Sequence, residues 1–371
     1  MSPIHQSECP VSSYIANYRP TSFVSSESGL TESVRTRQLD TRTSRRCSFG
    51  SSTPLLHRWD RARHYDARLN AFDDILSTMI HRIMSLVFAV VLIGLFSLPS
   101  GVAQTRKSTP PKSLRLYVLD CGKITVANGD SMGFKPGELA TANMTTPCFL
   151  IVHPKGTMMW DTGEIPDSAF AKGVSPATQG AFTVDRPLLP QLAAIGYTPA
   201  DITYLALSHY HGDHVANANA FAGSTWIVQQ GDRDAIFAPR PANQPRLGAV
   251  PDPAYFTELA KSKTIVLKGE DHDVFGDGTV VIKFTPGHTP GHQSLFLKLA
   301  KTGPVLLSGD LYHYPEEITY KRIPPFDTDK EQTAKSRAMI EEFVKKNHAQ
   351  LWIQHDYTAG IKRKIAPAYY D

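Results

Sequence analysis

The chain has 371 residues, of which 41% are hydrophobic and 20% charged, and both fractions are ordinary for a globular enzyme. The length allows two domains, although length alone does not fix their number. The formal net charge of +4 is small for this length, and the sequence has no concentrated basic patch, so nucleic acid is not an expected partner.

Residues 1–78 differ in composition from the rest of the chain. They hold ten Arg, no Lys and many Ser, with only scattered apolar residues. Because a targeting signal follows this stretch, we expect translation to start at Met79 or Met84 and residues 1–78 to be a non-native or disordered N-terminal extension. An Arg- and Ser-rich organelle transit peptide is the alternative, and the eight acidic residues of the stretch argue against it.

The segment 79–103 is predicted to be a secretory signal peptide. Arg82 precedes an apolar run from Leu86 to Leu98, and the small-x-small pattern Gly101-Val-Ala103 follows the run. The run is shorter than the roughly 20 apolar residues of a membrane span, although a membrane anchor or a buried helix is the alternative. We therefore expect a mature protein that starts near Gln104, is periplasmic or secreted, and does not contact the membrane.

After a polar, proline-bearing linker at 104–113, residues 114–371 form one predicted domain of strands and helices, which indicates an α/β or α+β fold. Leucines recur at helical spacing over 188–195, and the capping box Thr328-x-x-Glu331 predicts a second helix. A long proline-rich loop at 238–253 is expected to be a lid or a substrate wall. Strands are predicted at 114–119, 148–153, 157–160, 202–207, 225–229, 264–267, 280–284, 295–299, 305–307 and 351–353.

Two cysteines, Cys121 and Cys148, remain in the predicted mature segment. If the strand at 114–120 pairs antiparallel with 148–152, the end of one strand lies near the start of the other. A disulfide could then form in an oxidising compartment. Two buried free thiols are equally consistent with the sequence.

The pattern with the most chemical content is Ser208-His-Tyr-His-Gly-Asp-His214, directly after the apolar strand at 202–207. In an extended turn, His209 and His211 point one way, while Asp213 and His214 can turn toward a second point nearby. Neutral imidazole and carboxylate suit zinc or a similar divalent ion. Single histidines are usually solvated or packed in a core, but four ligand-type residues at this spacing predict a metal site.

This His-x-His-x-Asp-His motif resembles the signature of the metallo-β-lactamase superfamily. Among subfamilies, the paired Pro-Gly-His and the spacing to His355 are most similar to the N-acyl homoserine lactone hydrolases, the quorum-quenching lactonases. The resemblance implies a four-layer αβ/βα sandwich of the α/β (α+β) class, with the metals at the sheet edges. Matching stretches follow the family's order from about residue 114 to the C-terminus: Asp161-Thr-Gly163, Thr285–Phe296, Val305–Asp310 and Trp352–Asp356.

The resemblance also assigns residues to two zinc ions per chain. His288, the first histidine of the paired Pro-Gly-His, is expected to be structural or to support a ligand. Asp310 would bridge the two ions. The remaining ligands would be His209, His211 and His292 for the first ion, and Asp213, His214 and His355 for the second.

In the lactonases, a tyrosine three residues after the bridging aspartate assists at the substrate carbonyl. Here that position is His313, and Tyr312 comes one residue earlier. Either side chain could donate a hydrogen bond to a developing oxyanion. Together with Asp213, these two residues are the predicted catalytic groups.

The resemblance implies a dinuclear zinc hydrolase in which a metal-bound hydroxide attacks the ester carbonyl of a lactone, such as an N-acyl homoserine lactone. Other hydrolases of the same fold, acting on β-lactams, thioesters, aryl esters or organophosphates, are the alternative. A di-iron redox protein is disfavoured, because such proteins usually carry a carboxylate at the position of His211. The expected partner is a small-molecule substrate, and the sequence leaves a homodimer open.

Overall fold

A computed structural model of the chain describes residues 79–82, 84, 110–170, 176–239 and 252–371. The chain divides into two units, Met1–Pro99 and Ser100–Asp371, and the described residues of the first unit are helical. Within the described ranges, none of the helices combines the length and the apolar character that a membrane span needs. The predicted extension at 1–78, and the apolar run and cleavage pattern of the signal peptide, lie outside the described residues.

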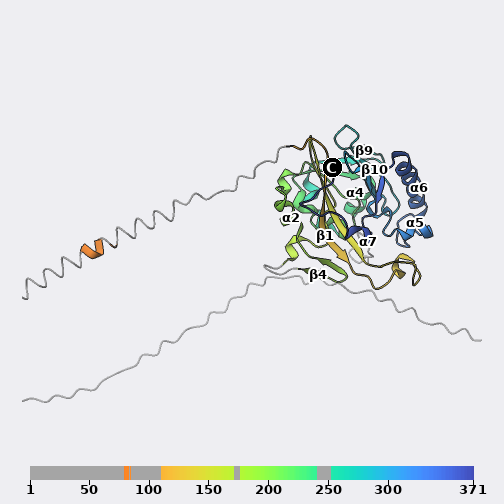
Figure 1. The fold of residues 1–371 in the computed structure, drawn as a ribbon, viewed down its shortest axis with the longest axis horizontal. Coiled ribbons are helices and arrows are strands. Elements are labelled where there is room, and N and C mark those ends of the chain that lie inside the picture. The colour runs from red at the N-terminus through yellow and green to blue at the C-terminus, as the bar shows by residue number, and fades with distance from the viewer. Residues whose placement is uncertain (1–78, 83, 85–109, 171–175, 240–251) are drawn as a thin grey trace, which may run out of the picture. The chain divides into compact units, whose positions relative to one another are not determined.

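The larger of two sheets has eight strands in the order β4-β5-β1-β2-β3-β6-β7-β8. β1, β2 and β3 pair antiparallel, whereas β3, β6, β7 and β8 pair parallel (Figure 1). Because parallel neighbours end at one edge, the segments that follow β3 and β6 come together there. The strands are β1 (Arg115–Ile124), β2 (Met144–His153), β3 (Gly156–Trp160), β4 (Ala177–Gln179), β5 (Phe182–Val184), β6 (Tyr204–Ala206), β7 (Thr225–Gln229) and β8 (Thr264–Leu267).

The smaller sheet has five strands in the order β13-β12-β11-β10-β9. Its pairs are antiparallel except for β12 and β13, which run parallel. These strands include the regions predicted at 280–284, 295–299 and 305–307, so those predictions are confirmed, and the strand predicted at 351–353 is observed one residue earlier, at 350–352. The strands are β9 (His272–Asp273), β10 (Val280–Phe284), β11 (Gln293–Leu299), β12 (Gly303–Leu307) and β13 (Gln350–Trp352).

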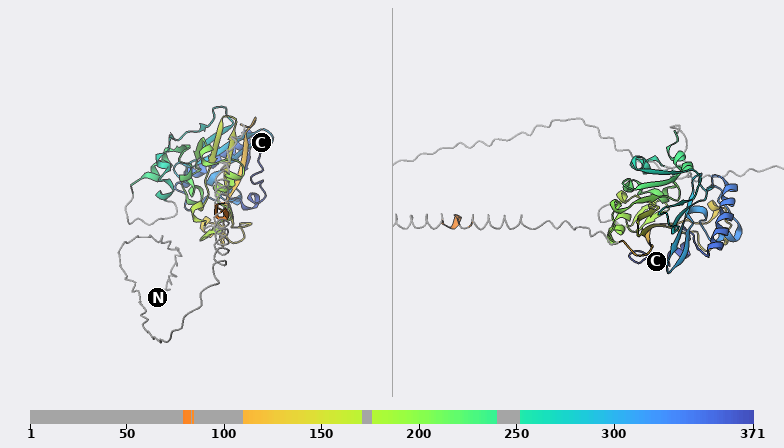
Figure 2. Two further views of the ribbon diagram at one scale, coloured as in Figure 1. Left: turned by 90° about the vertical axis from the view of Figure 1, so that its left-hand side faces the viewer. Right: turned by 90° about the horizontal axis from the view of Figure 1, so that it is seen from above.

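Helices cover the outer faces of both sheets, as Figure 2 shows for the described domain. The predicted helix at 188–195 is observed as α2, and α6 follows the predicted capping box. The observed N-cap of α6 is Asp329 rather than Thr328, because the Asp329 side chain accepts a hydrogen bond from Gln332 N. The α-helices are α2 (Leu188–Ala194), α3 (Gly212–Val215), α4 (Gln230–Phe237), α5 (Glu316–Tyr320), α6 (Lys330–Asn347) and α7 (Tyr357–Gly360).

Short 3₁₀ turns link these elements, and η7 carries one of the predicted metal ligands. Most of the predicted loop at 238–253 lies outside the described residues. The turns are η1 (Asp130–Met132), η2 (Asp167–Ala169), η3 (Pro199–Asp201), η4 (Ala218–Phe221), η5 (Pro253–Phe256), η6 (Leu259–Lys261) and η7 (Gly309–Leu311).

The apolar core fills the space between the two sheets and the space under the helices. Alternate residues of a strand point to opposite faces. In β2, Phe149 and Ile151 therefore pack between the sheets, whereas Leu150 packs toward the helices of the larger sheet. Both faces of the central strands are buried, which explains their continuous apolar sequence. The predicted four-layer αβ/βα sandwich is confirmed.

Cys121 and Cys148 form a disulfide in the structure, with their Cα atoms 5.7 Å apart. β1 and β2 pair with Leu119 opposite Cys148, and the register shifts between Asp120 and Lys123, which marks a β-bulge. Of the two alternatives that the sequence left open, the structure therefore contains the disulfide.

Candidate metal centre and substrate pocket

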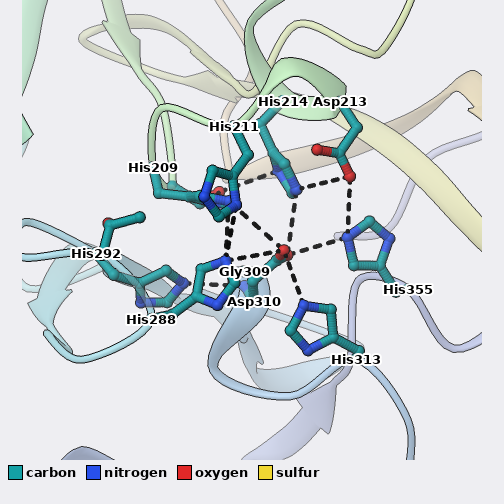
Figure 3. A network of polar contacts seen from close by, with 12 residues as sticks. His209, His211, Asp213, His214, His288, His292, Gly309, Asp310, His313 and His355 are labelled. Atoms are coloured by element: carbon teal, nitrogen blue, oxygen red, sulfur yellow. Dashed lines mark hydrogen bonds and ion pairs between the residues drawn. The ribbon is translucent and has the colours of Figure 1, made fainter. Parts of the chain in front are cut away.

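The predicted metal motif lies at the carboxyl edge of the larger sheet. β6 ends at Ala206, a bent segment follows, and α3 begins at Gly212 after His211, whose backbone is extended. His209 and His214 are buried. The ligand-type side chains of this segment point toward Asp310, which lies in η7 after the smaller sheet's strand β12 (Figure 3).

One group of ligand-type side chains consists of His209, His211, His288 and Asp310, whose potential ligand atoms all lie within 4.8 Å of one another. His288 Nε2 lies 3.2 Å from His209 Nε2 and 3.0 Å from His211 Nδ1. Asp310 Oδ2 lies 3.5 Å from His209 Nε2 and 3.4 Å from His288 Nε2. Three imidazoles and one carboxylate oxygen thus surround one point.

A second group consists of Asp213, His214, His355 and again Asp310. Asp310 Oδ1 lies 3.2 Å from His214 Nε2 and 3.1 Å from His355 Nε2. Asp213 Oδ2 is 3.5 Å and 3.4 Å from the same two nitrogens. Each carboxylate oxygen of Asp310 therefore faces a different group, which is the arrangement that a bridging carboxylate needs.

The structure does not bring His292 into the first group, so its assignment as a ligand stays a prediction. His292 Nδ1 lies 2.9 Å from the Thr285 carbonyl oxygen, and Nε2 accepts a hydrogen bond of 2.9 Å from Asp310 N. With both ring nitrogens engaged by the backbone, His292 holds η7 in place. His288, four residues earlier, lies among the ligand-type side chains of the first group instead.

In each group, a carboxylate outside the group contacts the Nδ1 atom of one imidazole. Asp327 Oδ1 lies 2.9 Å from His288 Nδ1, and Asp161 Oδ2 lies 2.9 Å from His214 Nδ1. Such partners fix the orientation of metal-binding imidazoles and raise their basicity. Sequence reasoning missed Asp327; the only signal was a carboxylate just before the predicted helix.

The electrostatics of the site fit divalent cations. Burial lowers the pKa of both His211 and His288 to about 3, so these imidazoles are neutral near pH 7 and keep a lone pair for a metal. Buried polar atoms normally have hydrogen-bond partners. Here His211 Nε2, His214 Nε2 and Asp310 Oδ1 are buried without a hydrogen bond of acceptable geometry. The residues present therefore fit a pair of divalent ions such as zinc.

A cavity of about 670 Å³ opens beside the two groups. Asp213, Asp310, His313 and His355 form part of its polar wall, and Glu164 is a further carboxyl group in the wall. Burial raises the pKa of Glu164 to about 9. The apolar wall consists of Ile124, Met132, Met144, Phe182, Tyr255 and Phe326.

Of the two predicted carbonyl donors, only His313 lines this cavity. His313 Nε2 lies 3.2 Å from Asp310 Oδ2. Burial by itself would lower the pKa of His313, but the charge of Asp310 and its contact with Glu317 outweigh burial and raise the pKa to about 10.

Tyr312 points to the opposite side, because successive residues of extended backbone alternate in direction. Its hydroxyl donates a 2.7 Å hydrogen bond to Glu341 Oε1 on α6, and the Arg337 guanidinium lies over its ring. The prediction that Tyr312 faces the substrate carbonyl is therefore wrong.

Comparisons with known proteins agree with this architecture. The model of the metallo-beta-lactamase superfamily matches residues 143–346. N-acyl homoserine lactonase AttM of Azorhizobium caulinodans is 30% identical over 264 residues, which cover 70% of this chain and 99% of the relative. N-acyl homoserine lactonase AiiA of Bacillus thuringiensis subsp. kurstaki is 28% identical over 268 residues, covering 69% and 98%.

Solved structures show the same similarity. The structure of a quorum-quenching N-acyl homoserine lactone lactonase superposes with a TM-score of 0.55 at 26% identity, covering 70% of this chain and 99% of the other. AidC, a dizinc quorum-quenching lactonase, superposes with a TM-score of 0.51 at 20% identity, covering 70% and 94%, and this likeness supports the fold alone.

Proposed function

Because this chain belongs to the metallo-β-lactamase superfamily, we propose that it is a dinuclear zinc hydrolase that opens the ring of a lactone. The observation that supports this proposal most directly is the position of Asp310. Its two carboxylate oxygens face two separate groups of imidazoles at the wall of one cavity. The relatives named N-acyl homoserine lactonases support N-acyl homoserine lactones as the substrate class.

Two bound ions would supply an activated water at neutral pH and would polarise the scissile carbonyl. The first ion would be held by His209, His211 and His288 and the second by Asp213, His214 and His355, with Asp310 between them. The shared carboxylate would offset positive charge on both sides. Asp213 also lines the cavity, so it would lie beside the bound substrate.

His313 would act on the substrate carbonyl. Its Nε2 lies on the cavity side beside Asp310, where an N–H group can donate to the oxygen that gains negative charge during attack. An imidazole would then act where the lactonases that the sequence resembles carry a tyrosine hydroxyl.

The apolar wall favours a substrate with a hydrocarbon portion. Methionine, isoleucine and aromatic side chains can cover an acyl chain, and burying its methylene groups contributes about 0.8 kcal/mol for each group. A substrate with a reactive ester at one end and an acyl chain at the other matches both walls of the cavity.

The test is the hydrolysis of a panel by the purified protein: N-acyl homoserine lactones, a β-lactam, a thioester, an aryl ester and an organophosphate, with zinc determined by elemental analysis. We expect the lactones to give the highest kcat/KM, with two zinc ions per chain. Faster turnover of another class would replace the lactone assignment, and a redox-active iron pair would overturn the zinc hydrolase.

We also propose that the protein is exported to the periplasm or secreted. The signal-peptide pattern at 79–103 supports export, and so does the Cys121–Cys148 disulfide, because disulfides persist in oxidising compartments. N-terminal sequencing of the exported protein should begin near Gln104. Material that keeps the apolar run in the membrane fraction would indicate an anchor.

A further inference from the structure

A chain of buried ionisable residues leads from the candidate metal centre into the space between η7, α5 and α6. It starts at Asp310, passes through His313, whose Nδ1 lies 3.3 Å from Glu317 Oε1, and ends at Arg337, which donates to Glu317 Oε2. Glu317 is 1% exposed and Arg337 is 6% exposed. Acidic and basic side chains thus alternate away from the centre.

Fold stability does not explain this arrangement. Removing a carboxylate and a guanidinium from water is costly, and well-packed apolar residues of similar volume often stabilise a core as well as a buried ion pair does. The positions are nevertheless occupied by charged side chains that contact a residue of the cavity wall, His313. Function at the cavity is the simpler explanation.

Arg337 holds Glu317 in one orientation. Its Nε donates to the Leu311 carbonyl oxygen at 2.8 Å, Nη1 donates to the Arg322 carbonyl, and Nη2 donates to Glu317. A guanidinium with three fixed acceptors has little freedom to turn. Glu317 Oε2 is therefore fixed by Arg337, and Oε1 is left facing His313.

Glu317 in turn orients the His313 ring. His313 Nδ1 and Glu317 Oε1 lie at ion-pair distance, and among the described residues both are buried atoms with no hydrogen-bond partner, so each is the nearest group that can satisfy the other. The ring also stacks on His355, with centroids 5.6 Å apart, and meets the edge of Phe326 at 5.7 Å. With Nδ1 directed to Glu317, Nε2 has to face Asp310 and the cavity.

We infer that Glu317, clamped by Arg337, is a positioning residue for the reaction. It accepts the Nδ1 proton of His313 and thereby aims Nε2 at the carbonyl oxygen of the substrate. A buried carboxylate that receives one ring N–H and so fixes the role of the other nitrogen is an arrangement known from other hydrolases. The inference rests on the proposed function, in which His313 acts on the carbonyl.

The test is a double-mutant cycle between Glu317→Gln and His313→Ala. Arg337 offers only donors, so it takes the amide oxygen of the glutamine and leaves the NH₂ group to face His313 Nδ1. Two donors then oppose each other and the ring loses its orientation. We expect kcat to fall about 10- to 100-fold, the usual effect of losing a partner behind an active group, while KM and zinc content stay unchanged.

In the His313→Ala background, Glu317→Gln should cause no further loss of kcat. An equal fold-loss in both backgrounds would show that Glu317 only supports the fold, and would overturn the inference. Glu341→Gln is the matched control, because it removes a neighbouring carboxylate that contacts Tyr312 rather than His313. It should retain the kcat of the unmodified protein.

A readout independent of turnover separates this inference from the proposed function. Long-range ¹H–¹⁵N NMR of the zinc-loaded protein, with the His313 signal assigned by its loss in His313→Ala, should show a protonated Nδ1 that Glu317→Gln removes. If Glu317→Gln does not fold, the double variant Glu317→Gln with Arg337→Met, which also removes the buried cation, takes its place. An unprotonated His313 Nδ1 in the unmodified protein would overturn the inference even if lactones are hydrolysed. A protonated Nδ1 in a protein that hydrolyses none of the panel would instead overturn only the proposed function.

Discussion

Replacing His288 and His292 separately by alanine tests which of the two histidines binds an ion of the first group and which supports the site. Both side chains are buried, and both belong to the same paired Pro-Gly-His sequence. His288 Nε2 lies among the other imidazoles, so His288→Ala should lower the affinity for one ion by more than the 10- to 100-fold that loss of an outer partner alone usually causes. We expect about one zinc ion per chain after dialysis.

His292→Ala should instead lower the free energy of unfolding. It leaves the Asp310 N–H without an acceptor and the Thr285 carbonyl without a ring donor. Each buried unsatisfied group costs about 1–3 kcal/mol, and the cavity adds to this, so we expect a loss of about 3–5 kcal/mol. Folded His292→Ala protein should still bind two ions.

The assay combines elemental analysis of folded protein, isolated by size exclusion, with urea unfolding. If His292→Ala does not fold, His292→Gln keeps some of the hydrogen bonds and allows the same comparison. A His288→Ala protein with two ions, together with a folded His292 variant with one, would refute the reasoning and restore His292 as the ligand.

Three further results are expected. Asp310→Asn should weaken both metal sites together, because each carboxylate oxygen faces a different group, and elemental analysis showing the loss of only one ion would argue against a bridge. His313→Ala should lower kcat about 10²- to 10³-fold with full zinc content, whereas Tyr312→Phe should be nearly as active as the unmodified protein, as steady-state kinetics will show. Burial raises the pKa of Glu164 from 4.5 to about 9, so the folded state holds a proton that the unfolded state releases. The free energy of unfolding should therefore fall as pH rises through this range, and urea unfolding of Glu164→Gln should show a weaker decline.

The sequence predicted the fold and most of the ligand-type residues that the structure brings together. Apolar strands and the His-x-His-x-Asp-His motif are local patterns, and the resemblance supplied Asp310 and His355 from distant segments. His288 and His292 carry the same tripeptide, so local sequence cannot separate them. Only the path of the turn decides which ring reaches the other imidazoles and which is held by the backbone.

Other site residues depend on tertiary contacts that leave no local pattern. Tyr312 and His313 are adjacent, and the direction of the extended backbone decides which of them faces the cavity. Asp327 lies just before α6, and Glu317 lies in the short helix α5, which is not predicted from the sequence. Their importance follows from which histidine each contacts, and the sequence does not encode that in any spacing.

The Cys121–Cys148 disulfide closes a covalent loop that contributes part of one wall of the candidate substrate cavity. The two cysteines are 27 positions apart, and the loop between them contributes Ile124, Met132 and Met144 to the apolar wall. Closing a loop of this length lowers the conformational entropy of the unfolded chain, which raises the free energy of the unfolded state by about 3.5 kcal/mol. None of the candidate metal ligands lies inside the loop, so protein made in a reducing cytosol should load its ions normally and yet hold the hydrocarbon part of a substrate less selectively.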